Sequence, residues 1–330
     1  MAQLASAPAL GAGGPPFESE YPDNKVCNSL ELQTFFITFS YLKIHPMKIT
    51  TLVDNYVASG KMGAEHGLSL YIEINENPVL NQEKLNILFD TGQSDLFYHN
   101  AKHLGIDLSQ TDLLIISHGH YDHTGGLAKF LEINDKATVY IRKEAFWHKM
   151  HNGKYIGIPN KEKLLQKDNP AKNRFILTKS IFTPISPLLS IISTPNKSLT
   201  SANNFSIKHD GKTEPAEDLF CDEQYLAFQI DGKTSLVTGC SHKGIIDIIS
   251  DTQHITGNKV IEVIGGLHTS KHSAKEIREL SQKMASTHVK HIQTGHCTGI
   301  EQYAMLKESL KDRISYNYTG KCFHSKLMIN

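Results

Sequence analysis

Between residues 117 and 126 the chain reads SHGHYDHTGG, directly after the apolar stretch LLII at 113–116. A short apolar stretch of this kind predicts a buried strand, and the polar loop then begins where that strand leaves its sheet. Metal-ligand side chains crowd the loop, namely His118, His120, Asp122 and His123. In an extended loop the first two face the same way, because one residue separates them, and the last two turn toward an adjacent point. The loop therefore predicts one or two neighbouring metal positions, and imidazole with carboxylate suits zinc, iron or manganese.

The composition of the whole chain narrows the class of protein. Its 330 residues carry 34 Lys and Arg against 34 Asp and Glu, a formal net charge of +0, and include 18 histidines. Without a basic surplus, binding to nucleic acid or to an anionic membrane surface is not expected. No apolar run reaches the length of about 18 residues that a membrane span needs. The 5 cysteines form no CxxC pair, which argues against a disulfide framework or a zinc ribbon.

From residue 47 onward, patterns typical of strands alternate with patterns typical of helices. Alternating or β-branched apolar residues predict strands at 49–53, 68–74, 85–89, 113–116, 137–141, 225–230, 235–237, 260–264 and 288–292. Helices are expected at 94–105, 125–131, 143–150, 243–253, 272–285 and 301–310. Neighbouring strands at the start, followed by alternating strands and helices, predict an α/β layered fold with a mixed sheet.

Two segments depart from this alternation. Residues 1–46 precede the regular pattern, and their first part is rich in Ala, Gly and Pro, so we expect an N-terminal extension that is partly disordered. Residues 151–222 are rich in Lys, Asn, Ser and Pro, with weak periodicity. Long irregular stretches in compact domains are usually functional lids or disordered segments. We interpret 151–222 as an insertion over the site, within a domain of residues 47–330; a surface excursion without a role is the alternative.

The order HxHxDH in residues 118–123 resembles the signature of the metallo-β-lactamase superfamily. That resemblance implies an αββα sandwich that holds one or two metal ions at one edge of its sheets. The segment DTG at 90–92 is similar to the earlier Asp motif of the superfamily, which implies that Asp90 orients a metal ligand from behind. Such an acceptor makes physical sense, because a ligating histidine needs a partner that fixes its tautomer and ring angle.

Further segments resemble one subgroup of this superfamily. They are AEHGLS at 64–69, YIGIP at 155–159, TGCSH at 238–242, GGLH at 265–268 and GHCTG at 295–299. The subgroup comprises metal-dependent hydrolases similar to the dihydropterin–ribofuranosylaminobenzene 5′-phosphate synthase of methanopterin biosynthesis. The resemblance covers roughly residues 47–330. It implies a small-molecule substrate, with phosphorylated and pterin-like compounds as the candidates.

The resemblance identifies the metal ligands that follow the signature less clearly than those within it. Many relatives have Thr-Gly-Asp where this chain has Thr-Gly-Cys, so Cys240 stands where a bridging carboxylate is expected. A thiolate can bind zinc or iron, but His242 is the better candidate ligand, and Cys240 is alternatively a small buried hydrophobe. His296 is expected as the last histidine ligand. His268 is either a further ligand or a substrate-facing acid–base residue, and His66 is a candidate for the lining of the site.

For a site with two ions, the resemblance implies His118, His120 and His242 around one ion, and Asp122, His123 and His296 around the other. Zinc is the first expectation for one or two such ions, with iron or manganese as alternatives. The ions would lower the pKa of a shared water, so that hydroxide attacks a carbonyl or phosphoryl centre. The residues expected to act in catalysis are Asp122, His268 and Asp90.

These features support three hypotheses about function. The first is a metal-dependent hydrolase of a small molecule. The second is a transferase like the named synthase of the subgroup, in which the metals activate a leaving diphosphate. The third is a redox or metal-binding protein without hydrolysis, against which His120 argues, since flavodiiron relatives carry Glu there. Free cysteines and the lack of a signal-peptide pattern favour the cytoplasm, and the oligomeric state stays open.

Overall fold

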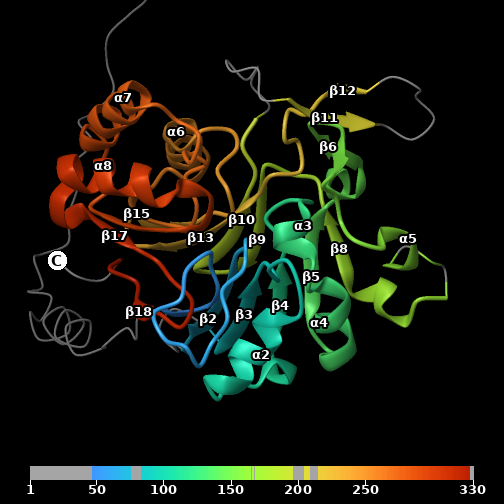
Figure 1. The fold of residues 1–330 in the computed structure, drawn as a ribbon. Coiled ribbons are helices and arrows are strands. Elements are labelled where there is room, and N and C mark those ends of the chain that lie inside the picture. Colours follow the sequence, from blue (N-terminus) through green and yellow to red (C-terminus); the bar gives the residue numbers. More distant parts are fainter. Residues whose placement is uncertain are drawn as a thin grey trace, which may run out of the picture. The chain divides into compact units, whose positions relative to one another are not determined.

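Two seven-stranded sheets pack face to face in the computed structural model, which describes residues 47–75, 83–164, 166, 168–195, 204–208 and 215–327 (Figure 1). In spatial order the first sheet contains β18 (Cys322–His324), β1 (Lys48–Val53), β2 (Ser69–Ile74), β3 (Leu85–Phe89), β4 (Leu113–Ile115), β5 (Thr138–Arg142) and β8 (Phe175–Thr178). The second contains β17 (Ile314–Tyr316), β16 (His291–Thr294), β15 (Lys259–Ile264), β14 (Lys233–Val237), β13 (Tyr225–Ile230), β10 (Leu189–Ile192) and β9 (Phe182–Ser186). Each sheet has antiparallel and parallel neighbours.

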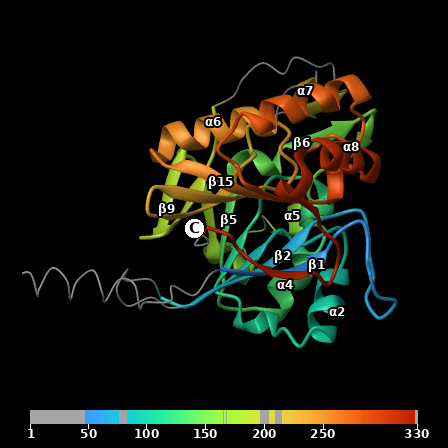
Figure 2. The same cartoon turned by 90° about the vertical axis from the view of Figure 1, so that its left-hand side faces the viewer.

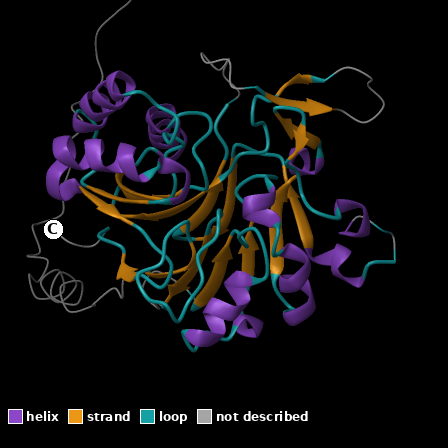
Figure 3. Ribbon diagram, in the orientation of Figure 1, coloured by secondary structure: helices purple, strands orange, loops and turns teal. Residues whose placement is uncertain are grey.

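Helices cover the outer faces of both sheets (Figures 2 and 3). The first sheet carries α2 (Leu96–His103) and α4 (Leu127–Ile133), and the second carries α6 (Ile245–Thr256), α7 (Ala274–Ala285) and α8 (Ile300–Leu310). Shorter helices lie in the connections: α3 (Tyr121–Thr124), α5 (Lys161–Leu164), η2 (Leu108–Gln110), η3 (Lys143–Phe146), η4 (Pro170–Arg174), η5 (His296–Thr298) and η6 (Lys311–Arg313). No helix in the described part of the chain is long and apolar enough to cross a membrane.

Alternation along single strands explains the layers. Leu70 and Ile72 of β2 belong to the core between the sheets, which also contains Leu226 and Val237 of the second sheet. Tyr71 belongs instead to the cluster under α2 and α4. Because successive side chains of a strand point to opposite faces, a strand that is apolar at nearly every position must be covered on both sides. The expected αββα layering with mixed sheets is confirmed.

A small third sheet consists of β12 (Ala216–Glu217), β11 (Phe205–Lys208), β6 (His148–His151) and β7 (Lys154–Tyr155). The expected helix over 143–150 is therefore wrong. Residues 143–146 form only the short η3, and β6 then pairs antiparallel with β11 along its whole length. A pairing partner more than 50 residues away overrides the local helical pattern here.

The segment 151–222, which we expected to be one insertion over the site, contributes strands to both large sheets. It supplies β8 to the first sheet, in parallel with β5, and it supplies β9 and β10 to the second sheet, beside β13. Its residues 165, 167, 196–203 and 209–214 lie outside the described residues, as does the expected extension 1–46. The small third sheet is the candidate for a cover over the site, because the ring centroid of Phe205 in β11 lies 5.6 Å from that of His120.

The carboxyl ends of several strands meet at one edge of the two sheets. In the first sheet β3 leads into Asp90 and β4 leads into the 117–126 loop, while in the second β14 leads into the 238–242 loop and β16 into His296. The strands within each of these sets are parallel, so their ends lie at the same edge. Ligand sites of α/β folds tend to form at such an edge.

Candidate metal centre

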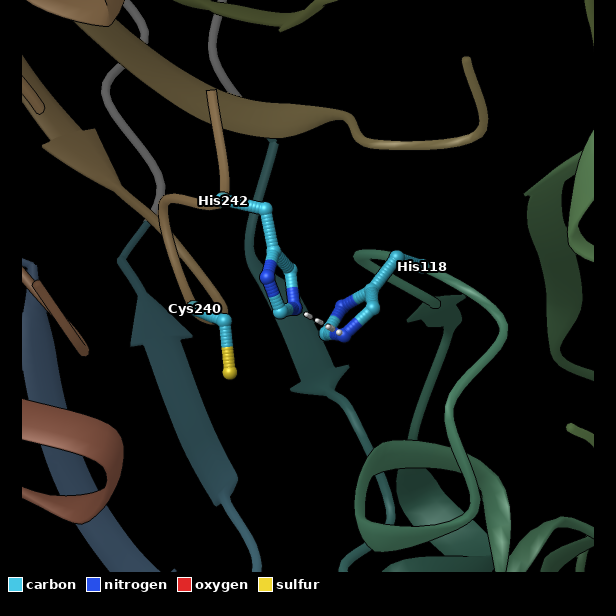
Figure 4. Close-up of side chains that lie close together, drawn as sticks. All are labelled: His118, Cys240 and His242. Carbon is cyan, nitrogen blue, oxygen red and sulfur yellow. Dashed lines mark hydrogen bonds between the residues drawn. The ribbon is translucent and has the colours of Figure 1, made fainter. Parts of the chain in front are cut away.

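Three imidazoles from two loops converge at this edge. His118 Nε2 lies 3.0 Å from His120 Nδ1 and 3.2 Å from His242 Nε2. Figure 4 shows the rings of His118 and His242 turned toward each other, with the thiol of Cys240 nearby. Ligand atoms about 2.0–2.1 Å from a tetrahedral zinc ion lie roughly 3.3 Å apart. We name His118, His120 and His242 the first donor group; the two distances from His118 Nε2 are those expected between ligands of one ion.

The hydrogen bonds behind His118 leave a lone pair on its Nε2. The hydroxyl of Ser117 donates to Asp90 Oδ2 at 2.6 Å, because an ionised carboxylate can only accept. The same hydroxyl therefore accepts from His118 Nδ1–H at 2.9 Å. Neutral His118 thus carries its proton on Nδ1 and presents the Nε2 lone pair to the first donor group.

A second donor group, Asp122, His123 and His296, lies beside the first. Asp122 Oδ2 is 3.4 Å from His296 Nε2 and 3.7 Å from His123 Nε2. His66 Nε2 approaches the same carboxylate oxygen at 3.2 Å, from a side chain that is about half exposed. A carboxylate with two imidazoles suits zinc, iron or manganese, so this donor set also fits a divalent ion.

Both imidazoles of the second donor group are held from behind. Asp90 Oδ2 accepts from His123 Nδ1–H at 2.7 Å, and Asn55 Oδ1 accepts from His296 Nδ1–H at 2.9 Å. Asp54 Oδ1 accepts from the backbone N–H of His296 at 2.9 Å. Asp54 and Asn55 were missed in the sequence; the available signal was a polar pair directly after the apolar β1. These bonds direct each Nε2 toward the carboxylate of the group.

The residues with open roles also border the site. Cys240 Sγ lies 3.2 Å from His123 Nε2 and 3.4 Å from His296 Nε2. The ring centroid of His268 lies 4.1 Å from that of His242, and its Nδ1 has no hydrogen-bond partner among the described residues. His268 is therefore adjacent to the first donor group, while Cys240 reaches the second.

Burial keeps the first donor group in its neutral form. Burial, reinforced by neighbouring histidines, holds the pKa of His118 and that of His242 well below the ordinary histidine value. Burial and the ammonium of Lys149 lower the pKa of His120 to about 3. Neutral imidazole is the form that binds metal, so all three rings are in their ligand form near neutral pH.

The second donor group holds a proton that competes with a metal ion. Burial opposes the charge of Asp122, but the positive charge of His123, with His296 and His66, holds the pKa of Asp122 well below its ordinary value. Burial would lower the pKa of His123, yet the carboxylates of Asp122 and Asp90 raise it to about 9. A metal ion that uses His123 Nε2 must displace this proton.

We expect the metal affinity of the second donor group to rise with pH up to about 9. Below the pKa of His123, which is about 9, the metal-free ring is protonated, so each lower pH unit should weaken the apparent affinity about tenfold. The imidazoles of the first donor group add no such slope, because their rings are already neutral. Titration against a competing zinc chelator between about pH 6.5 and 8.5 measures the slope, and an affinity independent of pH would contradict the expectation.

Residues 218–224, which we name the clamp, brace the backbone of both ligand loops. Asp222 Oδ2 accepts from the N–H of Gly119 at 2.6 Å, between two of the histidines of the first donor group. Glu223 Oε1 accepts from the N–H of His242 at 2.7 Å. The clamp was not predicted from the sequence; its signal was the acid pair Asp222 and Glu223, one residue ahead of the strand 225–230. It fixes the spacing of the first donor group.

A buried ammonium holds the clamp together. Lys149 of β6 is 0% exposed, and its Nζ lies 2.8 Å from Asp218 Oδ2 and 2.9 Å from Asp222 Oδ1. Burial opposes the charge, but the two carboxylates raise the pKa of Lys149, which stays ionised. Asp218 also accepts from the N–H of Phe220 at 2.8 Å, and that ring stacks on His242 with centroids 4.0 Å apart.

An Asp222→Asn variant should lose both stability and metal affinity. The amide leaves the buried Lys149 ammonium with one carboxylate fewer, which should cost about 3–5 kcal/mol in the free energy of unfolding. Loss of the rigid Gly119 contact should weaken zinc binding at the first donor group about tenfold or more. Urea unfolding and zinc competition measure both effects. In the matched control Asp112→Asn, the affected ion pair with Lys136 is partly exposed and should be worth about 1 kcal/mol or less. Equal losses in the two variants would refute the role of Asp222.

The chain belongs to the metallo-beta-lactamase superfamily, whose family model matches residues 77–200. Among its relatives is the 7,8-dihydropterin-6-methyl-4-(beta-D-ribofuranosyl)-aminobenzene-5'-phosphate synthase of Methanocaldococcus jannaschii. That protein is 30% identical over 291 residues, which cover 84% of this chain and 97% of the relative. An uncharacterized protein of the same organism is 32% identical over 282 residues, 83% of this chain and 98% of the relative.

A solved structure supports the same assignment. The crystal structure of a metal-dependent hydrolase of the beta-lactamase superfamily matches with a TM-score of 0.70 and 29% identity, over 84% of this chain and 99% of that one. The resemblance found in the sequence, both to the superfamily and to the synthase-like subgroup, is thus confirmed. The superfamily implies divalent metal binding. This chain offers candidate ligand sets for it, among them His118 with Cys240 and His242, His123 with Cys240 and His296, and His66 with Asp122 and His296.

Proposed function

We propose that this protein is a metal-dependent hydrolase that acts on a small molecule at a site of one or two divalent ions. The observation that carries the proposal is the convergence of two donor groups whose ring nitrogens face inward. His118 Nε2 is 3.0 and 3.2 Å from its two neighbours in the first donor group. Hydrogen bonds from behind give His118, His123 and His296 the tautomer that a metal ligand needs.

We assign a role to each residue of the site. His118, His120 and His242 would hold one ion, and Asp122, His123 and His296 the other, with zinc first and iron or manganese as alternatives. A bound divalent ion supplies Lewis-acid activation of water and stabilises negative charge that develops on oxygen. Asp90 keeps the ligand rings oriented, and Asp122 contributes the carboxylate of the second donor group. His268, whose Nδ1 is unpartnered among the described residues, would exchange a proton with the substrate.

Purified protein tested on a panel of phosphoesters, lactones and thioesters would examine the hydrolase proposal. The protein is first stripped with a chelator and then assayed without metal and with zinc, iron or manganese. We expect turnover of at least one ester class that depends on added metal. Absence of metal-dependent turnover on every class would count decisively against hydrolysis.

A transferase is the second candidate, because the synthase from Methanocaldococcus jannaschii aligns with 84% of this chain at 30% identity. In that case a dihydropterin bearing a diphosphate would be joined to a ribofuranosylaminobenzene phosphate, and diphosphate would leave. Product analysis by mass spectrometry with both substrates separates the candidates. The coupled pterin indicates the transferase, whereas hydrolysed diphosphate ester alone indicates the hydrolase.

The partners we propose are limited to a small molecule, with phosphorylated or pterin-like compounds first. The neutral balance of 34 basic and 34 acidic residues gives no support to a nucleic-acid or membrane partner. We propose a cytoplasmic location, because the cysteines 221, 240, 297 and 322 are unpaired thiols, as is usual in a reducing compartment.

A further inference from the structure

We propose that Cys240 is a metal ligand, bound as a thiolate and shared by the two donor groups. This inference rests on the proposed metal site and adds a ligand and a class of cation to it. Its basis is the position of one sulfur atom. Cys240 Sγ lies within 4.8 Å of ligand atoms of His118 and His242, and within the same limit of those of His123 and His296.

The immediate surroundings of the sulfur are polar. Cys240 Sγ is 3.2 Å from His123 Nε2 and 3.4 Å from His296 Nε2. The partners Asp90 and Asn55 hold both rings with Nδ1–H behind and Nε2 in front. A buried cysteine that serves only as a small hydrophobe is expected among apolar carbons. A sulfur that two ring nitrogens face, at 3% exposure, occupies the place of a ligand.

The chain path brings this sulfur to the ligand loops by a close backbone approach. Cys240 follows β14 through Gly239, where a Cβ would collide with the hydroxyl oxygen of Ser117. That hydroxyl is the one that links His118 to Asp90. Glycine at 239 therefore lets the loop of the second sheet pack directly on the hydrogen bonds that orient the ligands of the first sheet. Figure 4 shows Cys240 and His242 on this same loop, opposite His118.

A second thiol nearby provides the alternative assignment. Cys297 Sγ donates to the backbone carbonyl of Cys240 at 3.5 Å, and Cys297 forms a separate donor set with Cys240 and His268. Cys240 is a member of the donor set that contains His118 and of the set that contains His123, whereas Cys297 is a member of neither. The geometry thus assigns the shared position to Cys240 and makes Cys297 the matched control.

The proposed ligand has a defined chemistry. When the ion binds, the S–H bond of Cys240 breaks, a metal–sulfur bond forms, and the proton leaves to solvent. Thiolate ligands favour zinc, iron and cobalt over manganese and magnesium, which prefer oxygen. We therefore expect this site to select zinc or iron, and a Cys240→Asp variant to shift the preference toward manganese.

Cobalt(II) substitution tests the assignment on the full-length protein. Metal is removed with a chelator, cobalt(II) is titrated in, and the near-ultraviolet absorption from thiolate-to-cobalt charge transfer is recorded. We expect this band in the parent protein and in Cys297→Ser, and its complete loss in Cys240→Ala. Cys240→Asp should bind cobalt without the band. Cys240→Ser repeats the test should the alanine variant not fold.

The outcomes separate two failures. If the parent binds cobalt without the charge-transfer band, or if Cys240→Ala keeps the band, the thiolate assignment is overturned while the metal site stands. Loss of the band in Cys297→Ser with its retention in Cys240→Ala would move the ligand to Cys297. If the parent binds neither cobalt nor zinc, the proposed metal site itself fails, and the thiolate assignment fails with it.

Discussion

A His120→Ala variant is expected to bind one metal ion fewer than the parent and to lose most of its metal-dependent activity. The change removes one of the three ring nitrogens of the first donor group, in which those of His120 and His242 lie 3.0 and 3.2 Å from His118 Nε2. Residues that only orient a ligand already account for about 10–100-fold in affinity or activity. Loss of a ligand itself should therefore reduce the rate by more than about a hundredfold.

Elemental analysis after dialysis against metal-free buffer measures this loss directly, without a known substrate. His254→Ala is the control, because His254 lies exposed on α6, away from both donor groups. The control should keep the metal content of the parent. Unchanged metal content in His120→Ala would show that His120 is not a ligand, whatever happens to activity.

The fold and the core of the site could be predicted from local patterns. The apolar strand before 117–126 and the spacing of His118, His120, Asp122 and His123 are properties of one short segment. The structure indeed brings these four together with His242 and His296. Strand ends carry side chains to a common edge in any parallel arrangement, which favours a site there. The choice of His242 and His296 among the later histidines depended on the resemblance to the superfamily.

The residues that were missed act through partners far away in the sequence. Lys149 holds Asp222 across 73 residues, and Asp54 holds the backbone of His296 across 242. Lysine, aspartate and asparagine are usually exposed, so their burial follows only from tertiary contacts. The same reason explains the error over β6, since its local pattern is helical and its strand partner β11 lies beyond a long connection.

The two sheets contribute to the site in different ways. The first sheet supplies a ligand loop whose hydrogen bonds run through Asp90, while the second supplies His242 and Cys240 on one short loop. The clamp joins them, because Asp222 holds the first loop and Glu223 holds the second. Changes at Asp90 reach side chains of both donor groups, which makes this carboxylate the most informative position outside the two groups.

An Asp90→Asn variant is expected to weaken both metal positions about 10–100-fold while the fold is kept. Asp90 is fully buried, and Oδ1 accepts from the Ser117 N–H at 2.7 Å. Its Oδ2 accepts from the Ser117 hydroxyl and from His123 Nδ1–H. An amide that keeps the first bond must place its NH₂ group at the position of Oδ2. His123 must then accept at Nδ1 and carry its proton on Nε2, where the metal would bind.

The same substitution should also reverse the bond to His118. A Ser117 hydroxyl that accepts from the new NH₂ group is free to donate to His118 Nδ1, which moves the proton of this ring to Nε2 as well. Long-range proton–nitrogen NMR spectra of the imidazoles distinguish the two tautomers, and zinc competition measures the affinities. Asp107→Asn is the control, because Asp107 is exposed, caps η2 and accepts from the N–H of Ser109. If Asp90→Asn keeps Nδ1–H on both rings, or binds zinc as tightly as the control, then Asp90 does not set the tautomers of His118 and His123. A shift of both protons to Nε2, with a matching loss of zinc affinity, would show that one buried carboxylate governs two metal positions.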